Sequence, residues 1–192
     1  MPDLRVTGLY KSYGEKAVLS GLTFTLPAGG RLALMGRSGC GKTTLLRILL
    51  GLETADGGRI EGLPPRLSVV FQEDRLCPDF SAFDNVRLAA PAAAREEIFA
   101  CLASLGLGEA DGVRPVRDLS GGMRRRVAIA RAWLAPGELL LLDEPFKGLD
   151  DATRAAVTAY LDRTVGGRTL LLVTHDVSDA AAMHAPVLSL DT

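Results

Sequence analysis

This sequence of 192 residues has few aromatic residues and a net charge close to zero. Aromatic side chains make up 5% of the chain, and the formal net charge is −1 at pH 7. Without a broad basic field the chain is a poor match for nucleic acid, so we expect no nucleic-acid partner. No apolar run approaches the roughly 20 residues of a membrane-spanning helix, and no signal-like segment opens the chain. The sequence therefore predicts a protein that works inside the cell.

Cysteine is also rare, and the chain has three: Cys40, Cys77 and Cys101. Their spacing matches no metal-ligand motif, and an odd number suits reduced thiols better than a disulfide framework. Apolar residues, in contrast, make up 47% of the chain. A chain of this length and composition predicts one domain with a sizeable core.

The stretch GRSGCGKTT at 36–44 fits the phosphate-binding loop pattern, in which Gly, four residues and Gly are followed by Lys and Thr. Apolar runs on either side predict a buried strand at 31–35 and a helix at 45–50 that stops at Gly51. Glycines let the backbone curl so that its N–H groups face phosphate oxygens, and the helix N-terminus adds a positive dipole end. The predicted nucleotide contacts are Gly36, Arg37, Ser38, Gly39, Cys40, Gly41, Lys42, Thr43 and Thr44.

Two residues of this loop have specific expected roles. Lys42 would reach the β- and γ-phosphates, and the Thr43 hydroxyl would hold Mg²⁺. The alternative is a glycine-rich turn before an ordinary helix, a chance match in roughly one chain in a hundred of this length. The flanking strand and helix make that alternative rarer still.

The rest of the chain alternates short apolar runs with helical patterns. Strands are predicted at 4–10, 18–26, 68–71, 139–142, 169–173 and 187–190, and helices at 95–105, 123–134, 152–164 and 178–184. We expect turns at 11–16, 27–30 and 54–58, loops and short helices at 73–94, and a loop at 106–117. This pattern predicts an α/β fold with a mainly parallel sheet covered on both faces and an antiparallel part at the N-terminus.

Polar residues follow two of the buried strands. Asp143 and Glu144 come directly after four leucines, and His175 follows the strand at 169–173. In a doubly wound sheet the carboxyl ends of the strands line one crevice, together with the phosphate loop. Asp143 is therefore a candidate for holding Mg²⁺, and Glu144 for a general base toward water. The plainer alternative is a pair of turn residues.

Taken together, these motifs resemble the ATP-binding cassette (ABC) ATPases, the nucleotide-binding subunits of ABC transporters. The resemblance is carried by the phosphate loop, Gln72 after a strand, 119–123 (LSGGM), 139–144 (LLLLDE), 148–150 (GLD) and His175, in the order that the family shows. The LSGG tetrapeptide is the most specific element, because other phosphate-loop ATPases lack it. The resemblance implies a phosphate-loop core at about 1–72 and 136–192, with a small helical signature subdomain at about 73–135.

The resemblance also implies a role for each matching residue. Lys42, Gln72, Glu144 and His175 would be catalytic: Gln72 would sense Mg²⁺ and the attacking water, Glu144 would polarise that water, and His175 would contact the γ-phosphate. Mg²⁺ would be held by Thr43, Gln72 and Asp143. Tyr13 would stack on adenine, unless it is an ordinary surface tyrosine.

The remaining matches imply a second copy. Ser120, Gly121 and Gly122 would complete the ATP site of another subunit, with Asp150 at the same seam, so that two ATP molecules lie between two chains. Met123 departs from the family's usual Gln. The run 124–126 (RRR) is expected to be a solvated or internally paired face.

The resulting functional expectation is an ATP-hydrolysing subunit of an ABC importer, peripheral on the cytoplasmic face of the cell membrane, with ATP and Mg²⁺ as its cofactors. Residues 71–76 and 143–150 are similar to the nitrate, sulfonate and taurine importer group. Alternatives are a non-transport ABC ATPase of DNA repair or the ribosome, and a small phosphate-loop kinase. Expected partners are membrane permease subunits, a second ATPase copy or homologous subunit, and an extracytoplasmic substrate-binding protein.

The docking surface for the permease is expected at about 73–85, which follows Gln72. Its favoured contacts are Leu76, Cys77 and Phe80. For Phe83, docking and packing under the helix at 95–105 are equally good interpretations.

Overall fold

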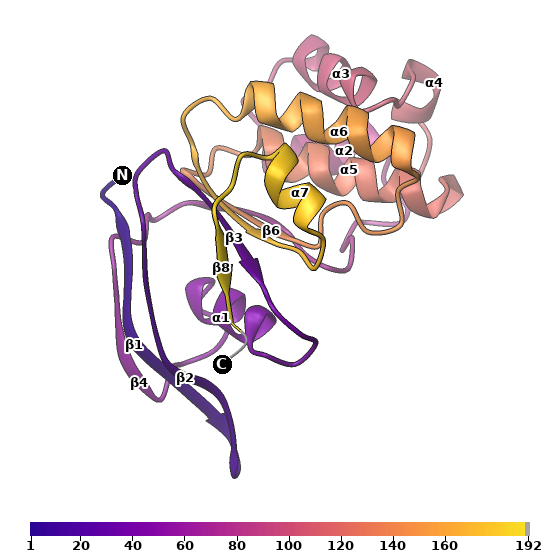
Figure 1. The fold of residues 1–192 in the computed structure, drawn as a ribbon. Coiled ribbons are helices and arrows are strands. Elements are labelled where there is room, and N and C mark those ends of the chain that lie inside the picture. Colours follow the sequence, from indigo (N-terminus) through magenta and orange to yellow (C-terminus); the bar gives the residue numbers. More distant parts are fainter. Residues whose placement is uncertain (191–192) are drawn as a thin grey trace.

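A computed structural model describes residues 1–190 (Figure 1). Within these residues the strands form a three-stranded antiparallel sheet, β2-β1-β4, and a five-stranded parallel sheet, β5-β6-β7-β3-β8. The strands are β1 (Leu4–Tyr13), β2 (Lys16–Leu26), β3 (Arg31–Met35), β4 (Gly57–Glu61), β5 (Leu67–Val70), β6 (Leu139–Asp143), β7 (Thr169–Val173) and β8 (Val187–Ser189). The helices are α1 (Lys42–Leu49), α2 (Ala82–Ala89), α3 (Arg95–Ser104), α4 (Glu109–Gly112), α5 (Gly121–Leu134), α6 (Asp151–Thr164) and α7 (Val177–Ala182), with a 3₁₀ turn at Val116–Asp118. The predicted fold class is confirmed.

The parallel sheet is buried on both faces, which explains its unbroken leucine runs. In β6, Leu140 and Leu142 belong to a core shared with α2, α3, α5, α6 and α7. Leu139 and Leu141, pointing the other way, belong to a second core shared with α1, β1 and β2. Figure 1 shows α1 between the antiparallel sheet and the parallel sheet. The helix that follows the phosphate loop is thereby held between the two sheets.

The antiparallel sheet extends into the segment 54–58, where the sequence predicted only a turn. That prediction was wrong for the last two residues, which belong to a strand. Gly57 begins β4, and Val6 of β1 pairs with Ile60. Ile60 is the only apolar residue of this edge strand, so the sequence has no alternation of apolar and polar residues that would predict a strand here. Gly58 is required here, because its φ is +94° and an added Cβ would lie 2.4 Å from the Gly8 carbonyl oxygen.

The predicted turn at 11–16 is also shorter, because β1 runs on to Tyr13 and β2 begins at Lys16. Asp56 accounts for the extension: its carboxylate accepts a 2.7 Å hydrogen bond from the Ser12 backbone N–H. Its other oxygen accepts a 3.1 Å bond from the Lys11 ammonium. This longer hairpin brings Tyr13 toward the phosphate loop.

Helices α2 to α5 lie together with α6 and α7 on the side of the parallel sheet away from α1 (Figure 1). Phe83 is buried and stacks on Phe99 with ring centroids 5.3 Å apart, so packing under α3 is the correct interpretation for this residue. The predicted loop at 106–117 contains α4 and the start of the 3₁₀ turn. Those elements are too short for a periodic pattern to reveal. No helix among residues 1–190 is long and apolar enough to cross a membrane.

Candidate active site

The phosphate loop leaves β3 and closes into the first turn of α1. Gly39 and Gly41 have φ of +84° and +101°, in the left-handed region. At Gly41, the residue before α1, an added Cβ would also lie 2.7 Å from the Val18 carbonyl oxygen. Lys42 Nζ lies inside this curl and donates to the carbonyl oxygens of Gly36 at 2.6 Å and Arg37 at 2.9 Å. The ammonium is thus positioned where a phosphate would be cradled.

The sheet order brings the other predicted residues to this loop. Strands β5, β6, β7 and β3 are neighbours, and Gln72, Asp143, Glu144, His175 and the phosphate loop lie at or just beyond their carboxyl ends. They share a cleft of about 510 Å³. Its lining consists of Tyr13, Lys16, Val18, Gly36, Ser38, Gly39, Gly41, Lys42, Thr43, Thr44, Gln72, Asp143, Glu144, Lys147 and His175. Parallel topology, rather than nearness in sequence, assembles this cleft.

Two residues of the loop do not line this cleft. Arg37 and Cys40 instead border a neighbouring cavity between β2, the loop and Ser189. The Cys40 sulfur lies 3.6 Å from Lys42 Nζ. Tyr13, in contrast, lines the cleft with a half-exposed ring.

Glu144 and His175 form a pair at the mouth of the cleft. His175 Nδ1 lies 2.7 Å from Glu144 Oε2 and 3.0 Å from Oε1, so this nitrogen carries the hydrogen that the carboxylate accepts. The imidazole is 71% exposed and the carboxylate 15% exposed. Glu144 also has a φ of +49°, which is rare for a side chain other than glycine or asparagine. A strained backbone therefore directs this carboxylate into the cleft.

Asp143 is the buried carboxylate of the cleft. Burial and the nearby charge of Glu144 raise the pKa of Asp143 to about 6, although Arg125 and Lys42 oppose the rise. A carboxylate in this state is stabilised by an added cation. The Thr43 hydroxyl and the Gln72 amide line the same cleft, and such oxygen donors suit Mg²⁺. These residues fit a Mg²⁺ ion.

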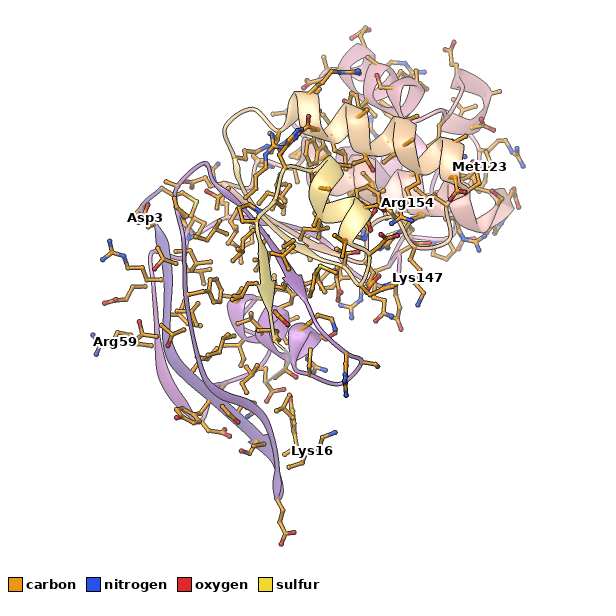
Figure 2. All side chains as sticks on the ribbon, in the orientation of Figure 1. Asp3, Lys16, Arg59, Met123, Lys147 and Arg154 are labelled. Atoms are coloured by element: carbon orange, nitrogen blue, oxygen red, sulfur yellow. The ribbon has the colours of Figure 1, made fainter. Side chains whose placement is uncertain are left out.

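The backbone around His175 is braced from α6 and α7. The Thr174 hydroxyl donates to Asp179 at 2.7 Å, and the Asp176 N–H donates to the Thr174 hydroxyl at 3.1 Å. Arg154 of α6 donates to Asp179 at 2.7 Å and pairs with Asp176. Bonds from Ser178 and Arg154 lower the pKa of Asp176 to about 2. Figure 2 shows Arg154 where α6 and α7 meet.

Ser120, Gly121, Gly122 and Asp150 do not line the cleft. Ser120 caps α5 by accepting the Met123 N–H at 3.2 Å, and Asp150 caps α6 by accepting the Thr153 N–H at 2.9 Å. Gly122 lies close to Gly148 and Leu149, so the two caps share one region of the surface. In Figure 2, Met123 and Lys16 lie at opposite ends of the molecule, which places this region away from the hairpin side of the cleft.

Sequence reasoning missed three basic residues. Lys16 and Lys147 line the cleft, and their only signal was position: one after the hairpin turn, one shortly after the carboxylates. Arg125 was predicted only as part of a charge run. That run is internally paired, because Arg124, Arg125 and Arg126 all donate to backbone carbonyl oxygens.

A second surface lies on the helical part. A groove of about 630 Å³ is lined by Asp79, Phe80, Ser81, Asp84, Arg87, Leu88 and Pro91. Phe80 and Leu88 are 46% and 59% exposed. Leu76 and Asn85, both within the expected docking stretch, point elsewhere: Leu76 packs against the core and Asn85 is buried.

Comparison with known proteins identifies the family. The family model described as ABC transporter matches residues 19–147. An aliphatic sulfonates import ATP-binding protein of Corynebacterium glutamicum is 45% identical, over 99% of this chain and 81% of its own. A protein of the same description in Paraburkholderia xenovorans is 43% identical over 98% of this chain and 57% of its own length. Another, in Ralstonia nicotianae, is 43% identical over 94% of this chain and 66% of its own length.

Solved structures agree. A dimeric bacterial ABC transporter cassette has a TM-score of 0.85 at 26% identity, covering 97% of this chain and 94% of that one. A bacterial ABC exporter with ATP bound has a TM-score of 0.85 at 27% identity, covering 99% of this chain and 37% of that one. The phosphate loop, the paired carboxylates and the LSGG helix thus occur on the fold of a nucleotide-binding cassette. This chain belongs to the ABC transporter family, as an ATP-binding and ATP-hydrolysing subunit.

Proposed function

We propose that the chain energises import through a membrane permease, from the cytoplasmic face of the membrane, with aliphatic sulfonates as the class of cargo. The observation that carries this proposal is identity of 43–45% to sulfonate import proteins over nearly the whole chain. The fold alone favours neither direction, since an exporter is as similar in structure as the isolated cassette. The chain spans 57–81% of the length of these relatives. The cargo and the partners of this chain are therefore part of the proposal.

The cleft suggests how each residue acts on ATP. Tyr13 stacks on adenine, the N–H groups of the loop bind the phosphates, and Lys42 exchanges its carbonyl partners for the β- and γ-phosphates. Thr43, Gln72 and Asp143 would hold Mg²⁺, which when bound neutralises phosphate charge.

Glu144 is the proposed general base. Its carboxylate accepts a proton from the attacking water. His175 holds that carboxylate at the mouth of the cleft until ATP binds, when the imidazole contacts the γ-phosphate instead. Gln72 lies just beyond the end of the neighbouring strand β5, where it would contact both the attacking water and the metal. The strained φ of Glu144 supports this assignment, since such strain gathers at functional positions.

The other half of each ATP site comes from a second copy. Ser120 lies at the N-terminal cap of α5, so its hydroxyl and the first N–H groups of that helix suit a phosphate anion. They lie outside the chain's own cleft, together with Gly121, Gly122 and Asp150. The proposed assembly is a dimer with two composite sites. The related bacterial cassette, whose solved structure is dimeric, supports this proposal.

The permease docks on the groove around Phe80. Asn85 builds this groove, because its buried amide accepts the Cys77 N–H at 2.8 Å and donates to the Phe80 and Ser81 carbonyl oxygens at 3.3 and 3.0 Å. These bonds fold the segment after Gln72 onto α2 and leave the Phe80 ring exposed. An apolar groove with charged rims suits a short amphipathic helix. We assign the groove to a helical signature subdomain at about 73–135, within a single domain whose nucleotide-binding core is at about 1–72 and 136–192.

The test is reconstitution with the permease and a sulfonate-binding protein in vesicles. The wild-type chain should drive ATP-dependent uptake of an aliphatic sulfonate. Phe80→Asp should keep the ATPase activity of the isolated chain within about twofold of the wild-type value. The permease should no longer co-purify with this variant, because a charge buried in the groove opposes docking. Leu52→Asp is the control, since Leu52 is 55% exposed and does not line the groove. Wild-type recovery of the permease with Phe80→Asp would refute this docking surface.

A further inference from the structure

Arg125 lies beneath the proposed general base. It is buried on α5, and its guanidinium donates to the carbonyl oxygens of Glu144 at 2.6 Å, Asp143 at 2.9 Å and Pro145 at 2.9 Å. Glu144 holds a left-handed backbone with φ of +49°, which needs support from its neighbours. Arg125 supplies that support on three consecutive residues.

The same guanidinium holds the Gln72 segment. Its Nη1 donates to the Phe71 carbonyl oxygen at 2.6 Å and to the Gln72 carbonyl oxygen at 3.4 Å. It also pairs with the Asp74 carboxylate at 3.2 Å. A planar guanidinium can serve two backbone segments at once because its donors lie in a fixed fork.

Arg125 also connects both segments to the helix that carries the signature. The residue lies on the first turns of α5, whose cap is Ser120. We propose that Arg125 is a positioning residue, which fixes the backbones of Gln72 and Glu144 relative to each other and to this helix. Through it, a shift of α5 changes the position of the general base, so the chain's own cleft responds to what Ser120 and Gly122 bind. This inference rests on the proposed ATP chemistry for its kinetic consequence, but not for its geometry.

A purely structural role is the competing explanation, and kinetics separate the two. Arg125→Lys keeps the charge, but its three donors lie on one nitrogen and cannot reproduce the planar fork whose three nitrogens serve six acceptors on the two segments. We expect kcat for Mg·ATP hydrolysis to fall about tenfold or more while KM stays within about twofold, since ATP contacts are untouched. Arg126→Lys is the matched control, because Arg126 donates only to Gly122, Leu105 and Gly106 among the described residues. Equal losses in the two variants, or unchanged kcat in Arg125→Lys, would overturn the proposal.

A second measurement needs no hydrolysis. Each segment carries one trypsin site, after Arg75 and after Lys147, and Arg59 on β4 gives an internal reference. In Arg125→Lys, cleavage at Arg75 and Lys147 should rise together severalfold while cleavage at Arg59 stays constant. Arg125→Met, which fills much of the volume without a donor, should give the same pattern.

The two measurements fail in different ways. A wild-type chain without ATPase activity would refute the proposed function, yet the cleavage pattern would still decide the role of Arg125. If cleavage rises at one site alone, at neither, or equally at Arg59, Arg125 does not hold the two segments together.

Discussion

At the scale of single residues, the site contains ionisable side chains that are buried away from water. Asp143 is the clearest case, because its pKa is about 6 instead of its ordinary value of 3.8. The folded chain therefore binds this proton more tightly than the unfolded chain. Stability falls as the pH rises from about 4 to 6, and the penalty is fully present above that window.

Replacing Asp143 with Asn should stabilise the chain when nucleotide and divalent metal are absent. At pH 7.5 the gain in free energy of unfolding should reach at most about 3 kcal/mol, the linkage equivalent of the raised pKa. Urea unfolding in EDTA at pH 7.5, 6 and 4.5 measures it, and the gain should shrink as the pH falls. Asp150→Asn is the control, because bonds from Thr153 lower the pKa of that carboxylate and no gain is expected. A pH-independent gain would contradict the raised pKa of Asp143.

At the scale of elements, strand ends and helix caps place the chemistry. The phosphate loop, Asp143, Glu144 and the Ser120 cap were predictable, since each is marked by a local pattern beside an apolar run. Strand β4 was not, because its stability comes from pairing with β1 and not from its own residues. Arg125 was equally hidden: a guanidinium with six backbone and side-chain acceptors looks, in sequence, like any charge run.

The junction of α6 and α7 gives a test at this scale. Arg154→Met should lower the free energy of unfolding by about 1–3 kcal/mol, because Asp179 would keep a buried carboxylate without its cation. The same change should slow ATP hydrolysis by loosening the segment that carries His175. Arg163→Met, on the same helix, is the control for a lost surface charge and should change both quantities little. Thermal melts and phosphate release measure the two effects, and an unaltered melt in Arg154→Met would show that the bracing is unimportant.

At the scale of the whole molecule, we propose that one chain holds half of each ATP site. Its cleft contains the phosphate loop, the proposed metal ligands and the proposed base, while Ser120, Gly122 and Asp150 face a different region of the surface. A monomer should therefore bind Mg·ATP, and two should pair only when nucleotide fills both clefts. Slowing hydrolysis without weakening binding should hold that pair together.

The direct measurement is the mass of the Glu144→Gln chain by light scattering after size exclusion, with and without saturating Mg·ATP. We expect a monomer without nucleotide and a dimer with it, because Gln keeps the shape of the side chain but accepts no proton from water. Adding Ser120→Arg to the same chain should keep it monomeric in ATP while nucleotide binding persists, since the second half of each site is then blocked. A Glu144→Gln chain that binds Mg·ATP and remains a monomer at saturation would contradict the composite site.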